Sequence, residues 1–129
     1  MKISKQLLYV ALGVVFWFVA AMIIRFLGEA VFSENNPFLL LMFVLAIPIT
    51  FIFIFITQKV ANIKKEELLS PIVIITFTAA FLDGIAMTWF RTLYSNSFEV
   101  SFYGAALILW GVALGLFLTH ILTNGSQKK

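Results

Sequence analysis

Four long apolar runs constrain the fold of this chain more than any other feature. They cover about residues 7–32, 37–57, 70–90 and 101–123, and each is long enough for the roughly 20 residues that span a bilayer core. Inside lipid every backbone N–H and C=O group needs a partner within the protein, so only helices and closed barrels cross. No run shows the alternating ten-residue segments of a barrel. The sequence therefore predicts an all-α, four-helix transmembrane bundle forming a single domain.

The composition agrees with a membrane protein and excludes several kinds of site. The chain is 62% hydrophobic and 12% charged, whereas soluble domains carry about 25% charged residues. It has no cysteine, which excludes disulfides, thiolate catalysis, iron–sulfur clusters and thiolate zinc sites. The single histidine, His120, has no second histidine or nearby acid at the spacing of a metal site. We therefore expect no metal and no cofactor, and we expect the basic residues to face a lipid bilayer rather than a nucleic acid.

Local signals mark the starts of two of the runs. Asn36 precedes Pro37, and Ser70 precedes Pro71; a capping side chain followed by proline at the first helical position is typical of a helix start. Pro48 falls in the middle of the second run, where it is expected to kink the helix or free a carbonyl for a neighbour.

The distribution of basic residues predicts how the chain is threaded. With four spans, one side of the membrane receives both termini and the 58–69 loop. That side holds seven lysines, namely Lys2, Lys5, Lys59, Lys64, Lys65, Lys128 and Lys129. The other side has only Arg25 and Arg91, near helix ends, together with Glu29, Glu34 and Glu99. Because lysine and arginine are enriched on the cytoplasmic side, we expect both termini in the cytoplasm.

Asp83 is the most unusual residue of the third run, where it stands in FLDGIAMTWFR. A central aspartate costs about 2.5–3.5 kcal/mol on insertion, so it needs a partner. Arg25 lies about 10 Å before the end of the first run, and Asp83 lies about 12 Å before Arg91, by the helical rise. The first and third helices run in the same direction, which predicts an intramembrane ion pair between Arg25 and Asp83. Glu29 and Arg91 are the charges that could join it.

The predicted cluster of Arg25, Asp83, Glu29 and Arg91 has three alternative interpretations. In the first, the pair only fixes the register of two helices. In the second, Asp83 carries a proton or cation in transport. In the third, it contacts a partner subunit or ligand.

Small residues predict where helices approach closely. Gly111 and Gly115 form GVALG on the fourth run, with Gly104 two turns earlier on nearly the same side. Such spacing favours close helix packing, within the chain or across a homodimer. On the third run the predicted inward face consists of Thr76, Ala80, Asp83 and Met87, with Gly84 and Thr88 on the adjoining stripe.

The aromatic residues divide into two groups by depth. Four of them lie near the ends of runs and are typical of an aromatic belt at the membrane interfaces, namely Tyr9, Trp89, Tyr94 and Tyr103. Trp17 and Trp110 lie deeper, so we expect them to pack inside the bundle or face a ligand.

Three segments carry a resemblance to a known family. NPFLLLMFVLAIPIT, AAFLDGIAMTWFRTLYSN and YGAALILWGVAL together resemble domain of unknown function family 5367, a family of small four-helix bacterial membrane proteins. The family pattern matches Asn36, Pro37, Pro48, Leu82, Asp83 and Asn96, while Ser95 stands where that pattern has proline. The resemblance implies a four-helix fold in a bacterial membrane and implies no activity.

These features favour a non-enzymatic integral protein of the bacterial plasma (inner) membrane. We expect it to act through helix–helix contacts, as an accessory or assembly subunit of a larger membrane complex or as a homo-oligomer. The alternative is a small dimeric transporter or channel, coupled to protons or ions, that uses Asp83. A membrane enzyme ranks third, because Asp83 and Glu29 would have to supply all acid–base chemistry and no nucleophile is evident.

Overall fold

The structure, a computed structural model, describes residues 3–32 and 35–127. It contains four long helices: α1 (Ile3–Val31), α2 (Pro37–Ala61), α3 (Leu69–Trp89) and α4 (Phe98–Gln127). Two short 3-10 helices, η1 (Lys65–Glu67) and η2 (Arg91–Leu93), lie just before and just after α3. Each predicted run coincides with one helix to within a few residues. All four helices are long and apolar enough to cross a membrane, and the predicted all-helical, four-helix architecture is confirmed.

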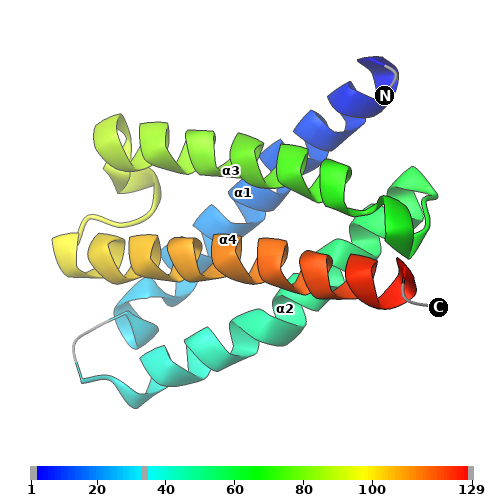
Figure 1. Cartoon of the computed structure of the whole chain (residues 1–129). Coiled ribbons are helices and arrows are strands. Elements are labelled where there is room, and N and C mark those ends of the chain that lie inside the picture. The colour runs from blue at the N-terminus through cyan, green and yellow to red at the C-terminus, as the bar shows by residue number, and fades with distance from the viewer. Residues whose placement is uncertain (1–2, 33–34, 128–129) are drawn as a thin grey trace.

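The four helices form a bundle in which two of them cross the other two obliquely. α3 and α4 lie side by side, and α1 passes behind them at an angle (Figure 1). α1 and α3 run in the same direction, while α2 and α4 return (Figure 1). The contact between α1 and α3 is the most extensive in the bundle. The parallel arrangement predicted for the first and third spans is therefore confirmed.

Glycines on α1 allow it to approach its neighbours closely. A Cβ atom added to Gly13 would lie 2.8 Å from Thr78 Cβ and 2.9 Å from the Ile75 carbonyl oxygen on α3. A Cβ atom added to Gly28 would lie 2.6 Å from Val100 Cγ1 on α4. All three distances are below 3.0 Å, so a larger residue at either position would require the neighbouring helix or side chain to shift.

The start of α2 follows its sequence signal, and the start of α3 does not. Asn36 Oδ1 accepts a hydrogen bond from Phe38 N at 2.9 Å, and Pro37 is the first helical residue, so the predicted cap is confirmed. α3 begins at Leu69, and its N-cap residue Leu68 makes no side-chain capping bond. The predicted cap at Ser70 is wrong: Pro71 lies inside the first turn, where a helix needs no N–H from it.

Two apolar clusters fill the bundle, one toward each end. The first contains Tyr9, Phe16, Ile54, Ala61, Leu68, Ile72 and Ile75. The second contains Ala21, Ile24, Phe32, Met42, Ala86, Tyr94 and Val100. Tyr9 and Tyr94 are 2% and 0% exposed, so their predicted place in an interfacial aromatic belt is wrong. Trp89, at 72% exposure, stands on the surface as that prediction requires.

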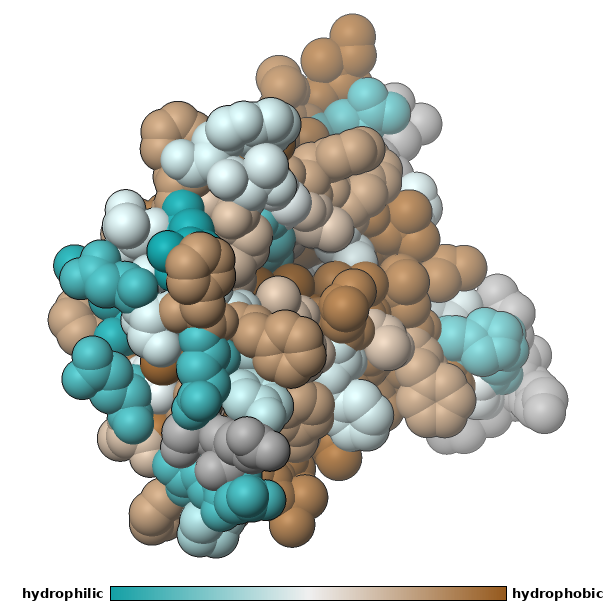
Figure 2. All heavy atoms as spheres, turned by 90° about the vertical axis from the view of Figure 1, so that its left-hand side faces the viewer, coloured by the Kyte–Doolittle hydropathy of each residue, from teal (hydrophilic) through white to brown (hydrophobic). Residues whose placement is uncertain are grey.

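The lysines and arginines of the described segments separate to opposite ends of the bundle. Lys5 Nζ donates to the Ala61 carbonyl at 2.8 Å, and Thr123 Oγ1 donates to the Lys65 carbonyl at 3.3 Å. These bonds bring the start of α1, the end of α2, η1 and the end of α4 together. The opposite end, where α1 ends and η2 follows α3, holds Arg25 and Arg91. Figure 2 shows this end, with hydrophilic side chains gathered toward one side of it and apolar side chains covering much of the rest.

Candidate functional site

A chain of hydrogen bonds inside the bundle links Trp17, Tyr94 and Asp83. Trp17 Nε1 donates to Tyr94 Oη at 2.9 Å, and the Tyr94 hydroxyl donates to Asp83 Oδ1 at 2.6 Å. Asp83 is 8% exposed and Tyr94 is 0% exposed. A buried carboxylate is costly unless hydrogen-bonded, and the phenol hydroxyl supplies such a bond. The partner that Asp83 requires is therefore Tyr94.

The turn after α3 brings the Tyr94 side chain back against α3. α3 ends where Phe90 N bonds to the Ala86 carbonyl at 2.8 Å, and η2 follows at once. Tyr94 N then bonds to the Arg91 carbonyl at 3.0 Å. This tight turn reverses the chain, so the Tyr94 side chain reaches back to Asp83, eleven residues earlier.

Arg25 binds the same turn from α1. Its Nη1 donates to the Thr92 carbonyl at 2.9 Å and to the Leu93 carbonyl at 3.2 Å. In place of the predicted Arg25–Asp83 ion pair, Arg25 bonds to backbone carbonyls and Asp83 bonds to Tyr94. The residues that they contact are consecutive in one turn. The backbone carbonyls satisfy the guanidinium, and the Tyr94 hydroxyl satisfies the carboxylate.

Glu29 and Arg91 lie apart from Asp83 in this arrangement. Glu29 is exposed on the last turns of α1. The Arg91 guanidinium carbon lies 3.7 Å from the centroid of the Phe98 ring, a cation–π contact. The prediction that Glu29 and Arg91 join Arg25 and Asp83 is therefore wrong for this structure.

Tyr94 is a hydrogen-bond donor over the whole physiological pH range. Burial raises its pKa above the usual value of a tyrosine, and the hydrogen bond and charge of Asp83 raise the pKa further. The bond from Trp17 acts in the opposite direction and is the weaker effect. The phenol is therefore protonated and directed at the carboxylate.

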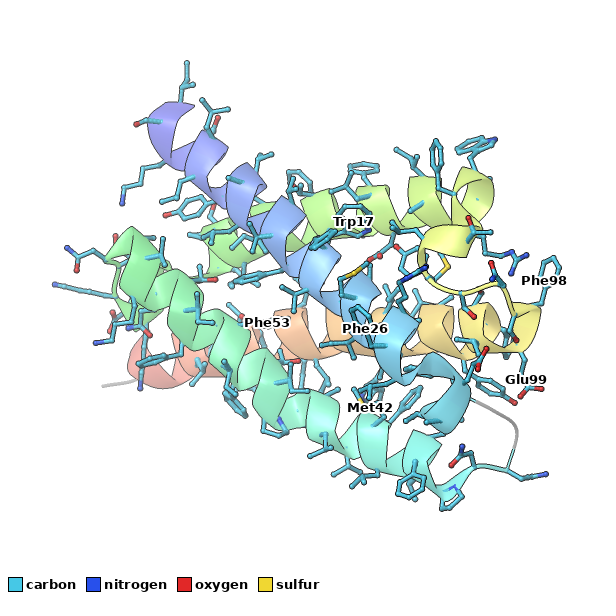
Figure 3. All side chains as sticks on the ribbon, turned by 180° about the vertical axis from the view of Figure 1, so that it is seen from behind. Trp17, Phe26, Met42, Phe53, Phe98 and Glu99 are labelled. Carbon is cyan, nitrogen blue, oxygen red and sulfur yellow. The ribbon has the colours of Figure 1, made fainter. Side chains whose placement is uncertain are left out.

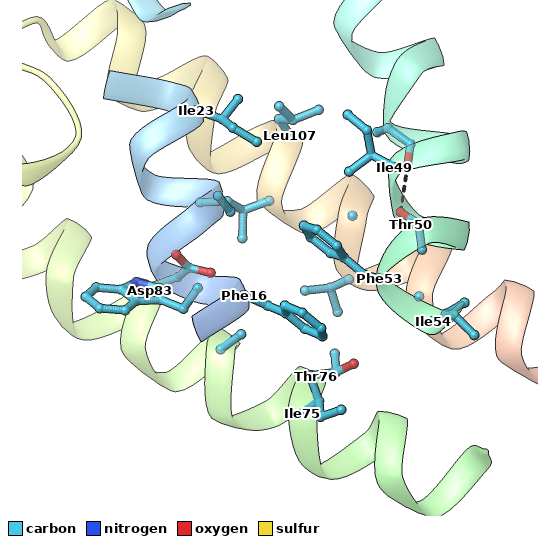
Figure 4. Close-up of a pocket in the computed structure, with 18 of the residues that line it drawn as sticks. Phe16, Ile23, Ile49, Thr50, Phe53, Ile54, Ile75, Thr76, Asp83 and Leu107 are labelled. Atoms are coloured by element: carbon cyan, nitrogen blue, oxygen red, sulfur yellow. Dashed lines mark hydrogen bonds between the residues drawn. The ribbon is translucent and has the colours of Figure 1, made fainter. Parts of the chain in front are cut away.

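A cavity of about 180 Å³ lies between the two apolar clusters, and Asp83 forms part of its wall. All four helices contribute to its lining, which is apolar apart from Asp83, Thr50 and Thr76. Figure 4 shows Asp83 at one side of this cavity and Thr50 at the other, with Phe16 and Phe53 between them in that view. Phe16 and Phe53 are stacked, with ring centroids 4.6 Å apart. Figure 3 shows Trp17, Phe53 and Met42 on the helices around this region.

Of the three predicted packing glycines of α4, one makes a close contact with α1 and two line the cavity. Gly104 packs closely, since a Cβ atom there would lie 3.0 Å from Ile24 Cγ2. Gly111 and Gly115 line the cavity instead. A Cβ atom on Gly111 would meet nothing within 4 Å, and one on Gly115 would meet only Thr76 Oγ1 at 3.9 Å. Within the chain these two glycines therefore make no close helix contact and leave space open, while the predicted packing across a homodimer stays a prediction.

The residues missed by sequence reasoning are Tyr94, Trp17 as its donor, and the glycines of α1. Tyr94 stands in FRTLYSN, between two apolar runs, and reads as an interfacial loop residue. The sequence signal that could have identified Tyr94 is Asp83 itself, an acid without a neighbouring basic residue in an apolar helix. A tyrosine hydroxyl eleven residues later, on a tight turn, is as suitable a partner for it as an arginine on another helix.

A family model described as a family of unknown function, DUF5367, matches residues 31–127. The chain belongs to this family. The match includes Asp83 and Tyr94, whereas Trp17 and Arg25 lie before the matched residues. No curated protein and no solved structure matches the chain. Family membership thus confirms the resemblance carried by the three sequence segments and leaves the activity of this DUF5367 protein to be argued from its site.

Proposed function

We propose that this DUF5367 protein is a non-enzymatic, multi-pass protein of the bacterial plasma membrane with both termini in the cytoplasm. The separation of charge along the bundle supports this orientation. Lys5, Lys59, Lys64 and Lys65 gather at the end where α2 meets η1, and an excess of lysine is typical of the cytoplasmic side.

Cysteine labelling tests the orientation, since the chain has no native cysteine. Glu66→Cys and Asn96→Cys place a thiol at exposed positions in the two opposite connections. We expect an impermeant maleimide added to intact cells to label position 96 and to leave position 66 unlabelled until the cells are opened. Labelling of position 66 in intact cells contradicts the proposed orientation.

The proposed activity is association through helix–helix contacts, as a homo-oligomer or as an accessory or assembly subunit. One observation carries this proposal: α3 exposes Gly84 and Thr88, one turn apart, on its outer face. A Cβ atom on Gly84 would meet nothing within 4 Å, and the Thr88 hydroxyl bonds back to the Gly84 carbonyl at 2.7 Å. Small residues at this spacing allow a helix from another molecule to approach closely.

Native-gel migration in mild detergent tests this association. We expect the wild-type protein to migrate as a homo-oligomer or within a larger complex, and Gly84→Leu to migrate as a smaller species. Ala113→Leu, a similar enlargement at an exposed position of α4, is the matched control and should leave migration unchanged. Migration of the wild-type protein as a monomer, unaffected by Gly84→Leu, contradicts the proposal.

A second candidate is a small proton- or ion-coupled transporter, and the presence of Asp83 in the wall of the cavity favours it. Transport predicts that Asp83→Asn leaves the fold intact and abolishes coupled flux in proteoliposomes. A structural role predicts that the same change lowers stability, with any flux altered only in proportion to the folded fraction.

A further inference from the structure

Three features of the cavity among the four helices indicate the chemical class of ligand that fits it. Its wall holds one carboxylate, from Asp83, in a surface that is otherwise apolar apart from Thr50 and Thr76. Aromatic rings of Phe16, Trp17 and Phe53 line the same space. Its volume is about 180 Å³, and an apolar cavity of about 150 Å³ is large enough to hold benzene.

We propose that this cavity binds a small organic cation with an apolar body, such as an aromatic or alkyl ammonium. The charge would lie against Asp83, and the apolar body would lie among the aromatic rings. Ammonium groups are attracted to aromatic faces, and this attraction strengthens when both groups are removed from water. Tyr94 bonds to Oδ1 of the carboxylate, which fixes the orientation of Asp83 beside the cavity.

The polar groups of the cavity favour an organic cation over a metal ion. A hard cation such as Ca²⁺ takes about six to eight oxygen ligands, whereas three polar side chains line the cavity, from Asp83, Thr50 and Thr76. An organic ammonium needs no such oxygen cage, because its apolar groups replace the missing ligands with contacts to the wall.

Gly111 keeps the cavity open and provides a test that leaves the charge in place. A Cβ atom on Gly111 would meet nothing within 4 Å, and the residue lines the cavity. A leucine there should fill the space intended for the apolar body without touching the bond between Tyr94 and Asp83. Binding at this site requires neither transport nor association with a partner, so its outcome is separate from the tests above.

Isothermal titration calorimetry with benzyltrimethylammonium tests the proposal, using the full chain in nanodiscs of neutral phosphatidylcholine. We expect saturable binding to the wild-type protein, at least tenfold weaker binding to Asp83→Asn, and no binding to Gly111→Leu. Ala113→Leu, two residues away and exposed, should bind as the wild-type protein does. The melting temperature of each variant shows that it is folded, and Gly111→Leu keeps the test decisive if Asp83→Asn does not fold.

Three results would overturn the proposal. The first is the absence of saturable binding of benzyltrimethylammonium to the wild-type protein. The second is equal binding of its neutral isostere, neopentylbenzene, and the third is full binding by folded Asp83→Asn, since either of these would show that the cavity does not select a cation.

Discussion

The bond between Tyr94 and Asp83 should contribute more to stability than any interaction between Arg25 and Asp83. Tyr94 is fully buried, and its hydroxyl lies 2.6 Å from Asp83 Oδ1. A buried hydrogen bond contributes about 0.5–1.5 kcal/mol, and about 1.5–3 kcal/mol when one partner is charged. Bonds between membrane helices measure lower, at about 0.6 kcal/mol on average. We therefore expect a coupling free energy of about 1–2 kcal/mol between Tyr94 and Asp83.

A double-mutant cycle measures this coupling directly. Tyr94→Phe, Asp83→Asn and the double variant are unfolded with dodecyl sulfate in mixed micelles, and helix content is followed by circular dichroism. Tyr94→Phe alone should cost about 2–3 kcal/mol, because it leaves both Asp83 Oδ1 and Trp17 Nε1 without the partner they have here. Tyr103→Phe, which removes a hydroxyl from a partly buried tyrosine on α4, is the matched control and should stay within about 0.5 kcal/mol of the wild type.

The same cycle with Arg25→Gln and Asp83→Asn distinguishes the two arrangements. Arg25 bonds to the carbonyls of Thr92 and Leu93, so its coupling to Asp83 should remain below about 0.5 kcal/mol, as for groups without a direct contact. A larger coupling for Arg25 than for Tyr94 would refute the arrangement described here and restore the ion pair predicted from the sequence.

Three further predictions concern the pH dependence of Tyr94, the glycines of α1 and α3, and the cap of α2. Because the pKa of Tyr94 is raised in the folded state, its contribution to stability is complete below the usual tyrosine pKa of about 10 and is lost as the pH rises above that value; alkaline unfolding titrations should show a steeper loss for the wild type than for Tyr94→Phe. Gly13→Ala should destabilise by about 1–3 kcal/mol through overpacking against Thr78, whereas Gly84→Ala, with open space around it, should be neutral or slightly stabilising in the same assay. Asn36→Ala should cost about 0.5–2 kcal/mol by removing the α2 cap, with Asn36→Ser as the variant expected to retain most of the stability.

The four long helices were predictable because a helix able to cross a bilayer needs about 20 mostly apolar residues, a signal that composition alone carries. The start of α2 was predictable for a local reason, since Asn36 and Pro37 together satisfy the first turn. Ser70 and Pro71 carry the same local signal, yet α3 begins earlier. The bond from Ile72 N to the Leu68 carbonyl, at 3.0 Å, closes a first turn that already includes Ser70.

The glycines were less predictable, because spacing along one helix does not reveal which face meets a neighbour. GVALG on α4 has the spacing of a packing motif, but Gly111 and Gly115 face the cavity. Gly13 and Gly28, fifteen residues apart on α1, make close contacts with two different helices. Only the relative placement of the helices decides between these outcomes.

The partner of Asp83 follows from the cost of removing charges from water. An ion pair with Arg25 inside the bundle would desolvate two charges, and the penalty for both often exceeds their attraction. The Tyr94 hydroxyl satisfies the carboxylate without burying a second charge, and it is delivered by a turn that closes over only eleven residues. Arg25 meanwhile remains exposed near the end of α1, where the carbonyls of Thr92 and Leu93 in η2 accept hydrogen bonds from its guanidinium group. Arg25 and Asp83 therefore bond to consecutive residues of one turn, Arg25 to the carbonyls of Thr92 and Leu93 and Asp83 to the hydroxyl of Tyr94.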